Sequence, residues 1–292
     1  MNNSRSEVNI ILPAYNEEDS LRILLPDLTM KYPDYKIIVI NDGSTDSTAE
    51  VCKENNIEVI SHPYKMGNGA SIKTGTRSAS SDVIVFMDAD GQHATEDVQR
   101  LLDKLNDGFD MVVGARHSST HTSVLKLFGN SFYNRFASLM TGHKISDLTS
   151  GFRAVRTDIF RKYLYLMPNG FSYPTTSTMA FFRSGHAVTY IPIRAEKRTE
   201  NTTSNIKVLK DGVRFFVIIL KIGALFSPMR LFLPLSTAVF LIGLAYYAYT
   251  FIMYHRFTNM SALLFISSLM IFLIGILSEQ ISSLHYRDSE ND

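Results

Sequence analysis

Residues 82–93 have the sequence Asp82-Val83-Ile84-Val85-Phe86-Met87-Asp88-Ala89-Asp90-Gly91-Gln92-His93, which is the strongest indication of the fold in this chain. It is an apolar run that ends in two carboxylates one residue apart, followed by a glycine, an amide and an imidazole. Because side chains alternate along an extended chain, Asp88 and Asp90 should face the same side, with Gln92 following them around the turn. Oxygen ligands clustered in this way suit a hard divalent ion that also holds a substrate diphosphate. The alternative is a solvated turn, and the strand-like context favours the metal site.

The first half of the chain repeats this pattern, in which a short apolar run is followed by polar residues and a helical pattern. Strands are predicted at residues 8–13, 36–40, 57–60, 83–87, 110–114 and, at a sheet edge, 188–193. A longer helical pattern covers residues 124–140, and a further helix is expected between Arg153 and the strand at 188–193. Short strands alternating with helices indicate an α/β fold with a mostly parallel sheet. Ligands bind beyond the carboxyl ends of the strands in such sheets, and the polar residues cluster there.

The composition limits the classes of function. The 292 residues carry a formal charge of +1, which gives no argument for a nucleic-acid partner. Cys52 is the single cysteine, so an internal disulfide is excluded and a reducing compartment is indicated. Residues 1–7 are polar, and we expect no cleavable signal peptide there.

The last eighty residues have the composition of a membrane anchor. Residues 232–254 and 257–278 contain no charged side chain, and each segment is long enough to cross a hydrocarbon core of roughly 30 Å. Only His255 and Arg256 separate the two segments, which predicts a tight transmembrane hairpin rather than two buried helices of a soluble protein. Basic residues crowd the side nearer the N-terminus, at Lys207, Lys210, Arg214, Lys221 and Arg230. The positive-inside rule then places the N-terminal domain in the cytoplasm.

These observations predict four segments. They are a cytoplasmic α/β domain at 1–205, juxtamembrane interfacial helices at 206–230, the transmembrane hairpin at 231–284 and a polar tail at 285–292. An apolar stretch at 213–226 that carries Arg214 and Lys221 has the pattern of a helix lying in the membrane interface. Small hairpin residues such as Gly243, Ala245 and Ala248 could pack between subunits of a homo-oligomer.

Four motifs in order carry a resemblance to a known family. They are Pro13-Ala14-Tyr15-Asn16-Glu17, Asn41-Asp42-Gly43-Ser44, Asp88-Ala89-Asp90-Gly91-Gln92 and Ser150-Gly151-Phe152-Arg153. Together they resemble the family 2 glycosyltransferases, which have the Rossmann-like GT-A fold, over residues from about 8 to 205. The nearest group is the polyprenyl-phosphate glycosyltransferases, which includes dolichol-phosphate mannose synthase. The sequence Ser227-Pro228-Met229-Arg230 before the hairpin also resembles the membrane-anchored members.

The resemblance implies a donor site and a metal site. The donor nucleotide would contact Pro13, Ala14, Tyr15, Glu17, Asp42, Lys65, Asp88 and Ala89. Glycines in the segment that follows Lys65 would allow the backbone to approach the donor closely. The metal, Mg²⁺ or Mn²⁺, would be held by Asp88, Asp90 and Gln92, with His93 either bordering the site or lying in the loop without a catalytic role. Without the resemblance, Glu17 would be read as a carboxylate in the first turn of a helix, and Asp42-Gly43-Ser44 as a turn.

The acceptor side calls for cations. A lipid monophosphate, with a second pKa of about 6, is largely a dianion at neutral pH and needs no general base. It needs cations that bind the phosphate and align it with the leaving group. The candidates are Arg116, Lys126, Arg153 and Arg198, although relatives often carry arginine and serine where Lys126 and Asn130 stand here. Asp147 would either pair with Arg153 or act as a base for a hydroxyl acceptor. The catalytic set is therefore Asp90, Asp147 and Arg116.

The function predicted from the sequence is an inverting, metal-dependent transfer of one sugar from a UDP- or GDP-linked donor to a polyprenyl phosphate such as dolichyl or undecaprenyl phosphate. Three alternatives stay open. A glycosyltransferase acting on a lipid hydroxyl such as diacylglycerol would require a base, and Asp147 could supply it. A processive polysaccharide synthase would carry a Gln-x-x-Arg-Trp motif, and this chain has no tryptophan. A non-catalytic membrane protein that senses a sugar nucleotide would not need the intact Asp-x-Asp pair.

Overall fold

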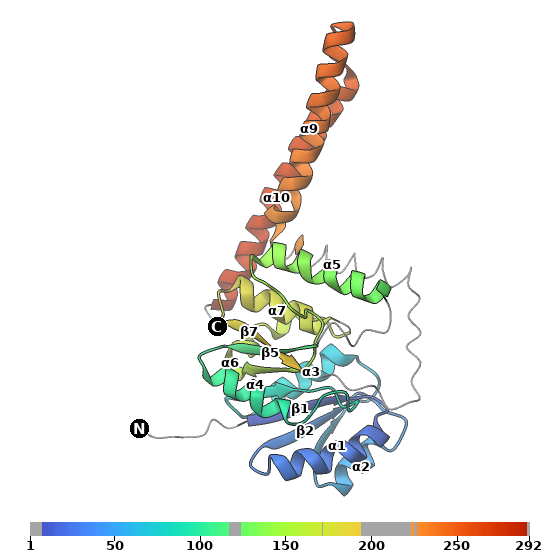
Figure 1. Ribbon diagram of the computed structural model, residues 1–292, viewed down its shortest axis with the longest axis vertical. Helices are drawn as coiled ribbons and strands as arrows, with labels where there is room; N and C mark the ends of the chain where they lie inside the picture. Colours follow the sequence, from blue (N-terminus) through green and yellow to red (C-terminus); the bar gives the residue numbers. More distant parts are fainter. Residues whose placement is uncertain (1–7, 117–123, 171, 194–222, 225–226, 291–292) are drawn as a thin grey trace. The chain divides into compact units, whose positions relative to one another are not determined.

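The computed structural model (Figure 1) describes residues 8–116, 124–170, 172–193, 223–224 and 227–290, with the backbone alone described at 124–132 and 285–290. The chain divides into two compact units. The first comprises Met1–Asn134 and Ile145–Asn205, and the second comprises Arg135–Lys144 and Ile206–Asp292. The interfacial helix predicted at 213–226 lies almost entirely outside the described residues.

The first unit is built on a seven-stranded sheet with the order β3-β2-β1-β4-β6-β5-β7. The strands are β1 Val8–Ala14, β2 Lys36–Asn41, β3 Glu58–Ser61, β4 Val83–Phe86, β5 Met111–Arg116, β6 Arg153–Arg156 and β7 Val188–Ile193. Only β6 runs antiparallel to its neighbours, β4 and β5, and the remaining pairs are parallel. The predicted α/β class, the mostly parallel sheet and the edge position of the last strand are therefore confirmed.

Helices cover the sheet and bury its apolar strands. They are α1 Glu18–Lys31, α2 Thr48–Glu54, α3 Asn68–Ser78, α4 Asp97–Asn106, α6 Thr157–Lys162 and α7 Tyr173–Arg183, with a short 3₁₀ turn, η2, at Leu164–Leu166. Helix α5, Val124–Thr141, is divided between the two units after Asn134. Helix α3 packs on β1 and β2, and α4 packs on β5 and β6 (Figure 1). Every side chain of β4 is buried, which explains why its sequence is a continuous apolar run. Each such buried aliphatic side chain contributes roughly 1.5–3 kcal/mol.

One strand was not predicted from the sequence, and it shapes the site. The residues from Arg153 onward form β6, and the helix expected between Arg153 and residue 188 follows it as α6, with α7 after that. In this antiparallel strand Arg153 pairs with Phe86 of β4 and with Val113 of β5. The start of β6 therefore lies near the carboxyl ends of β4 and β5. The loop that precedes it, residues 147–152, is thereby brought beside Asp88, which follows β4, and Arg116, the last residue of β5.

The second unit contains the hairpin, formed by α9 Pro228–Tyr254 and α10 Asn259–Glu290. Both helices are long and apolar enough to cross a membrane, over Pro228–Tyr254 and Asn259–Leu284. They are joined by reciprocal hydrogen bonds in which the hydroxyls of Ser236 and Ser268 each donate to the other residue's carbonyl at 3.0 Å. At the base of α9, Arg230 donates to the carbonyl of Met140 in the last turn of α5, at 2.8 Å. A cation at the C-terminus of a helix is favoured by the helix dipole.

Candidate active site

The carboxyl ends of β1, β2 and β4 enclose a cavity of about 360 Å³. Its lining residues are Pro13, Ala14, Tyr15, Glu17, Asp42, Lys65, Asn68, Ser71, Asp88, Ala89 and Asp90. All eight residues predicted for the donor nucleotide are in this set. The set also contains Asp90, which was predicted as a metal ligand. The structure thus brings the predicted donor residues into one cavity, and their roles stay predictions.

Asp42 organises the loop that covers one side of this cavity. Its two carboxylate oxygens accept the backbone N–H groups of Met66 and Gly67, each at 2.8 Å. The carboxylate also lies 2.9 Å from Nδ1 of His62. The loop so held carries Lys65, whose Nζ stands 3.5 Å from the centre of the Tyr15 ring. A cation over an aromatic face is a stabilising arrangement, so the loop position is fixed from both sides.

The glycines of this loop allow a close approach to another backbone segment, while the approach to the donor predicted for them stays a prediction. The N–H groups of Gly69 and Ala70 donate to the carbonyls of Gly170 and Asn169, at 3.1 and 2.8 Å. A Cβ atom placed on Gly69 would lie 1.9 Å from the carbonyl oxygen of Pro168. The backbone that comes close to the start of α3 is therefore the segment 168–170, and the glycine at 69 is required by that packing.

Asp88 and Asp90 follow β4 at the floor of the cavity. Asp88 Oδ2 lies 3.6 Å from Nε2 of His93, whose ring stacks on Phe152 with centroids 4.7 Å apart. Burial disfavours the charged form of Asp88, but His93 and the more distant guanidinium groups outweigh it, so the pKa of this carboxyl lies below its ordinary value. Asp90 Oδ1 accepts the backbone N–H of Gln92 at 3.1 Å, and the side chain of Gln92 is not part of the cavity lining.

The donor set of this floor fits a divalent ion that is shared with a ligand. Within the described ranges, no group of three or more His, Cys, Asp or Glu side chains is placed to hold a metal. Two carboxylates suffice for Mg²⁺, which is usually bound by one or two carboxylates together with substrate phosphates. Gly151 leaves space beside Asp88, because a Cβ there would lie 3.0 Å from Oδ2. Asp88 and Asp90 are thus the residues that would hold the ion.

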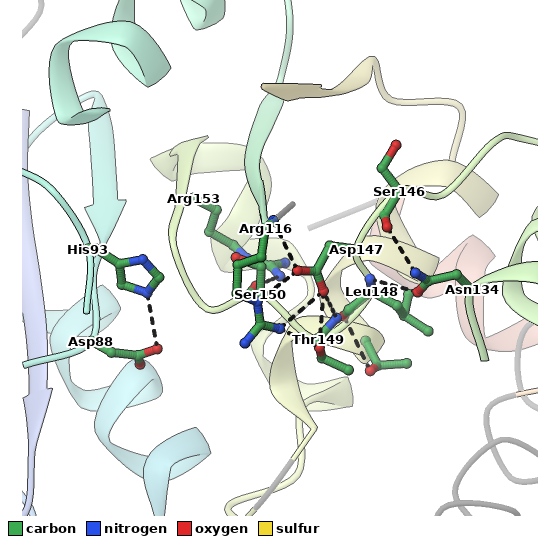
Figure 2. Close-up of polar contacts among 11 residues, drawn as sticks. Asp88, His93, Arg116, Asn134, Ser146, Asp147, Leu148, Thr149, Ser150 and Arg153 are labelled. Atoms are coloured by element: carbon green, nitrogen blue, oxygen red, sulfur yellow. Dashed lines mark hydrogen bonds and ion pairs between the residues drawn. The ribbon is translucent and has the colours of Figure 1, made fainter. Parts of the chain in front are cut away.

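A second cavity, of about 230 Å³, adjoins the first and shares Asn68 and Asp88 with it. Its remaining lining residues are Arg116, Thr149, Gly151, Gly170, Ser172, Tyr173, Pro174 and Thr175. Figure 2 shows how Arg116 is held: Nε lies 2.9 Å from Asp147 Oδ2, and an NH2 nitrogen lies 3.2 Å from Oδ1. The same nitrogen donates to the hydroxyl of Thr149 at 2.7 Å. The exposed fraction is 29% for the Arg116 side chain and 11% for Asp147.

This ion pair shifts the pKa of both partners toward the charged forms. Burial disfavours each charge, but the contact with Asp147 raises the pKa of the Arg116 guanidinium. Burial likewise works against the Asp147 carboxylate, yet Arg116 and then Thr149 hold its pKa below the ordinary range. The predicted pairing of Asp147 with Arg153 is therefore wrong, because Arg116 takes that place.

Arg153 is buried inside the domain. Its exposed fraction is 0%, and its guanidinium donates to the carbonyls of Ser150 and Pro174 and to the hydroxyl of Ser177. These contacts tie the loop before β6 to the first turn of α7, and burial lowers the pKa of the group. A side chain enclosed in this way does not reach an acceptor phosphate, so the acceptor role predicted for Arg153 is not retained.

The other two predicted acceptor cations are not placed. Lys126 belongs to α5, where only the backbone is described, and Arg198 lies outside the described residues. The two cavities also contain polar residues that sequence reasoning missed, notably Asn68, Ser71 and Thr149. Asn68 lies in the glycine-containing segment that follows Lys65, and Thr149 lies between Asp147 and the motif at 150–153. Their position next to predicted site residues could have identified them.

Two family models match the chain. The model described as Glycosyl transferase family 2 matches residues 9–164, more than half of the chain, and the model described as GtrB C-terminal hairpin matches residues 227–284. The chain belongs to glycosyl transferase family 2. The resemblance inferred from the four motifs is thereby confirmed, as is the assignment of the chain as a glycosyltransferase.

Among its relatives in this family is the glycosyltransferase AglJ of Haloferax volcanii, which is 26% identical over 95% of this chain and 94% of its own length. The polyprenol monophosphomannose synthase of Mycolicibacterium smegmatis is 29% identical over 70% of this chain and 86% of its own. A solved structure of glucosyl-3-phosphoglycerate synthase from Mycobacterium tuberculosis superposes with a TM-score of 0.61 at 19% identity, over 75% of this chain and 80% of that one. This structural similarity shows that the first unit of this chain and that synthase have the same fold.

Proposed function

We propose that this glycosyltransferase moves one sugar from a nucleotide sugar, UDP- or GDP-linked, to a polyprenyl phosphate. The product is a lipid-linked monosaccharide. The observation that carries the proposal is the pair of adjoining cavities that share Asp88, one with two carboxylates at its floor and the other with a fixed arginine. A metal-bound diphosphate suits the first cavity, and an anionic acceptor suits the second.

In the proposed reaction an oxygen of the lipid phosphate attacks the anomeric carbon of the sugar. The bond from that carbon to the β-phosphate oxygen breaks, and the nucleoside diphosphate leaves with both bonding electrons. Single in-line displacement inverts the anomeric configuration. The acceptor oxygen is already deprotonated at neutral pH because the second pKa of a phosphate monoester is about 6, so no residue has to take a proton. Arg116 would bind the attacking phosphate and align it with the donor.

A divalent ion, Mg²⁺ or Mn²⁺, would supply charge neutralisation on the departing diphosphate. Asp88 and Asp90 are the residues we assign to it, and the glucosyl-3-phosphoglycerate synthase of similar fold was solved with Mn²⁺ and UDP-glucose. Asp42 and the loop at Lys65 would hold the nucleoside end of the donor. Gln92, predicted as a third ligand, is assigned no contact because its side chain does not line the cavity.

Transfer to a lipid hydroxyl such as diacylglycerol is the second candidate, and the state of Asp147 argues against it. A hydroxyl acceptor needs a base that is free to accept a proton. Both oxygens of Asp147 are engaged by Arg116, and its pKa is lowered, so this carboxylate is a poor proton acceptor near neutrality. A phosphate acceptor makes no such demand.

The names of relatives support the acceptor class and the membrane setting. One relative is a polyprenol monophosphomannose synthase, and an undecaprenyl-phosphate mannosyltransferase of Micrococcus luteus is 29% identical over 64% of this chain. The hairpin at 227–284 would hold the enzyme beside a lipid acceptor. The excess of basic residues before the hairpin supports an orientation with the catalytic domain in the cytoplasm.

Replacing a metal carboxylate tests the donor half of this proposal. Asp90→Asn removes a charge at nearly constant shape, so we expect sugar transfer to fall by at least roughly a hundredfold, as for loss of a group that stabilises the leaving diphosphate. The thermal melting of the variant should stay close to that of the wild type, which serves as the check that the fold is intact. Transfer at the wild-type rate would refute the assignment of Asp90 to the metal.

A further inference from the structure

An asparagine of helix α5 is hydrogen-bonded to the backbone of the loop that contains Asp147 (Figure 2). Asn134 Nδ2 donates to the carbonyl of Ser146 at 2.8 Å, and its Oδ1 accepts the backbone N–H of Leu148 at 3.1 Å. One side-chain amide thus bonds to the backbone on both sides of Asp147. This residue was not singled out by the sequence and lines neither cavity.

These two hydrogen bonds of Asn134 determine the geometry in which the Asp147 carboxylate contacts Arg116. Fixing the backbone before and after a residue restricts the direction of its Cα–Cβ bond, and so the places its side chain can reach. The carboxylate accepts hydrogen bonds from three nitrogens of Arg116, which are its backbone N at 3.3 Å, Nε at 2.9 Å and an NH2 nitrogen at 3.2 Å. The adjacent residue of the helix, Tyr133, is also anchored next to the second cavity, with its hydroxyl 3.2 Å from that of Thr175.

We propose that Asn134 is a positioning residue for the acceptor: it sets the backbone at 146–148, which aims Asp147, which in turn holds Arg116 in the orientation that binds the acceptor phosphate. This inference rests on the proposed function, because it takes Arg116 to be the cation that binds the acceptor. Asn134 itself touches neither donor nor acceptor in this account.

The chemistry of the position explains why an asparagine suits it. The group must present one donor and one acceptor side by side, which an amide does. An aspartate could accept from Leu148 but has no hydrogen to give to Ser146, and it would add a negative charge near Asp147. A glutamine has the same amide on a side chain one methylene longer, which displaces both bonds. Asn134→Ala and Asn134→Asp therefore remove both bonds and one bond, respectively.

The test compares these variants with a matched control, Asn55→Ala. Asn55 also donates from Nδ2 to a backbone carbonyl at 2.8 Å, but it lies at the end of α2 and lines neither cavity. With a purified full-length chain and undecaprenyl phosphate as acceptor, we expect Asn134→Ala to lower kcat/KM for the acceptor by roughly tenfold, in line with the loss of two hydrogen bonds. The KM for the donor should stay within about twofold of wild type, and Asn55→Ala should change neither value.

A double-mutant cycle separates positioning from general destabilisation. If Asn134 acts through Arg116, the tenfold effect of Asn134→Ala should shrink to less than about twofold in an Arg116→Ala background, because the group it positions is gone. An undiminished effect in that background would overturn the proposal. An equal rise in the KM for the donor would overturn it as well.

Hydrogen exchange gives a readout that does not depend on transfer. The amide of Leu148 is bonded to Asn134, so its exchange should be at least tenfold faster in Asn134→Ala and unchanged in Asn55→Ala. Unchanged exchange at residues 146–149 would show that the hydrogen bonds of Asn134 do not stabilise this loop, and would refute the proposal. Faster exchange combined with an Arg116→Ala enzyme that uses the acceptor normally would instead refute the acceptor role of Arg116, on which the proposed function depends.

Discussion

Arg116 and Asp147 are the residues that make the second cavity suited to an anion. Arg116 directs one edge of its guanidinium, Nε and an NH2 nitrogen, to Asp147, and a hydroxyl of Thr149 fixes the same edge. A guanidinium held by two contacts in its own plane keeps a single orientation. The cavity therefore presents a cation that is already oriented. Less side-chain entropy is lost when it binds a phosphate than would be lost by a mobile lysine.

Arg116→Lys tests whether this orientation matters beyond the charge. Lysine keeps the positive charge but has no planar fork, so it cannot bind Asp147 and an acceptor phosphate in the same geometry. We expect kcat/KM for the polyprenyl phosphate to fall by about 10–100-fold, with the KM for the donor unchanged. Steady-state kinetics with varied acceptor give the answer, and a lysine variant as active as wild type would show that charge alone is sufficient.

The pH dependence of stability should reveal the Asp147 ion pair. The folded-state pKa of Asp147 is lowered, so the pair stabilises the fold above the ordinary aspartate pKa of about 4 and loses this contribution as pH falls below it. Asp147→Asn should therefore lower Tm at pH 7 by roughly 3–8 °C, and the difference should shrink below about pH 4. Melting curves from pH 3 to 8 test this, and a difference that persists unchanged in acid would contradict it.

The residues that sequence reasoning placed well lie at the carboxyl ends of strands or in the loops that follow them. Every predicted donor residue lines the first cavity, because the carboxyl ends of parallel strands meet at one edge of the sheet. The predictions that are not retained concern Gln92, whose side chain does not line the cavity, and Arg153. Arg153 looked like a site cation but is enclosed by α7, and nothing in its local sequence marks that burial. The partner of Asp147 is 31 residues away in the chain, a distance that no spacing rule covers.

Strand β6 is the element on which the arrangement of the site depends. Four residues long, with an arginine at each end, it has neither the length nor the apolar run that identifies a strand in a sequence. Its antiparallel pairing with β4 and β5 supplies the stability that its own sequence does not. Because β6 runs antiparallel to β4 and β5, the loop that precedes it places Asp147, Thr149 and Gly151 near the carboxyl ends of those two strands.

The contact between the start of α3 and the segment 168–170 should be sensitive to one methyl group. In Gly69→Ala the new Cβ would lie 1.9 Å from the carbonyl oxygen of Pro168, so the two backbones must separate and both hydrogen bonds to 169 and 170 must weaken. We expect a loss of roughly 1–3 kcal/mol in stability, the usual range for overpacking of a close contact. Gly170→Ala is the control, since a Cβ there meets nothing within 4 Å. Equal melting of the two variants would contradict the prediction.

The whole molecule joins a family 2 domain to a hairpin with the length and composition of a membrane anchor. The sequence predicted the hairpin well because an uncharged segment of this length has few other uses. Within the hairpin, the paired hydroxyls of Ser236 and Ser268 satisfy each other's polar groups, which hydrocarbon could not do. The distribution of basic residues predicts the side of the membrane on which the catalytic domain lies.

Cysteine labelling can determine that side. The single native cysteine, Cys52, is buried and its pKa is raised to about 11 by burial, so it should react little. Two added cysteines report on the two ends: Ser80→Cys on the exposed surface of the catalytic domain and Phe257→Cys in the hairpin turn. In intact cells an impermeant maleimide should label Phe257→Cys and spare Ser80→Cys until the membrane is opened. The reverse pattern would place the catalytic domain outside.

Transfer of sugar to lipid is the measurement on which the proposed function stands. The purified protein is given Mg²⁺ or Mn²⁺, a panel of labelled UDP- and GDP-sugars, and either undecaprenyl phosphate, dolichyl phosphate or diacylglycerol. We predict that label enters the lipid phase with a polyprenyl phosphate, from one donor, and only with metal present, and that Asp90→Asn lowers this transfer by at least roughly a hundredfold. Transfer to diacylglycerol in place of the phosphate, or nucleotide binding without transfer from any donor, would contradict the reaction proposed here.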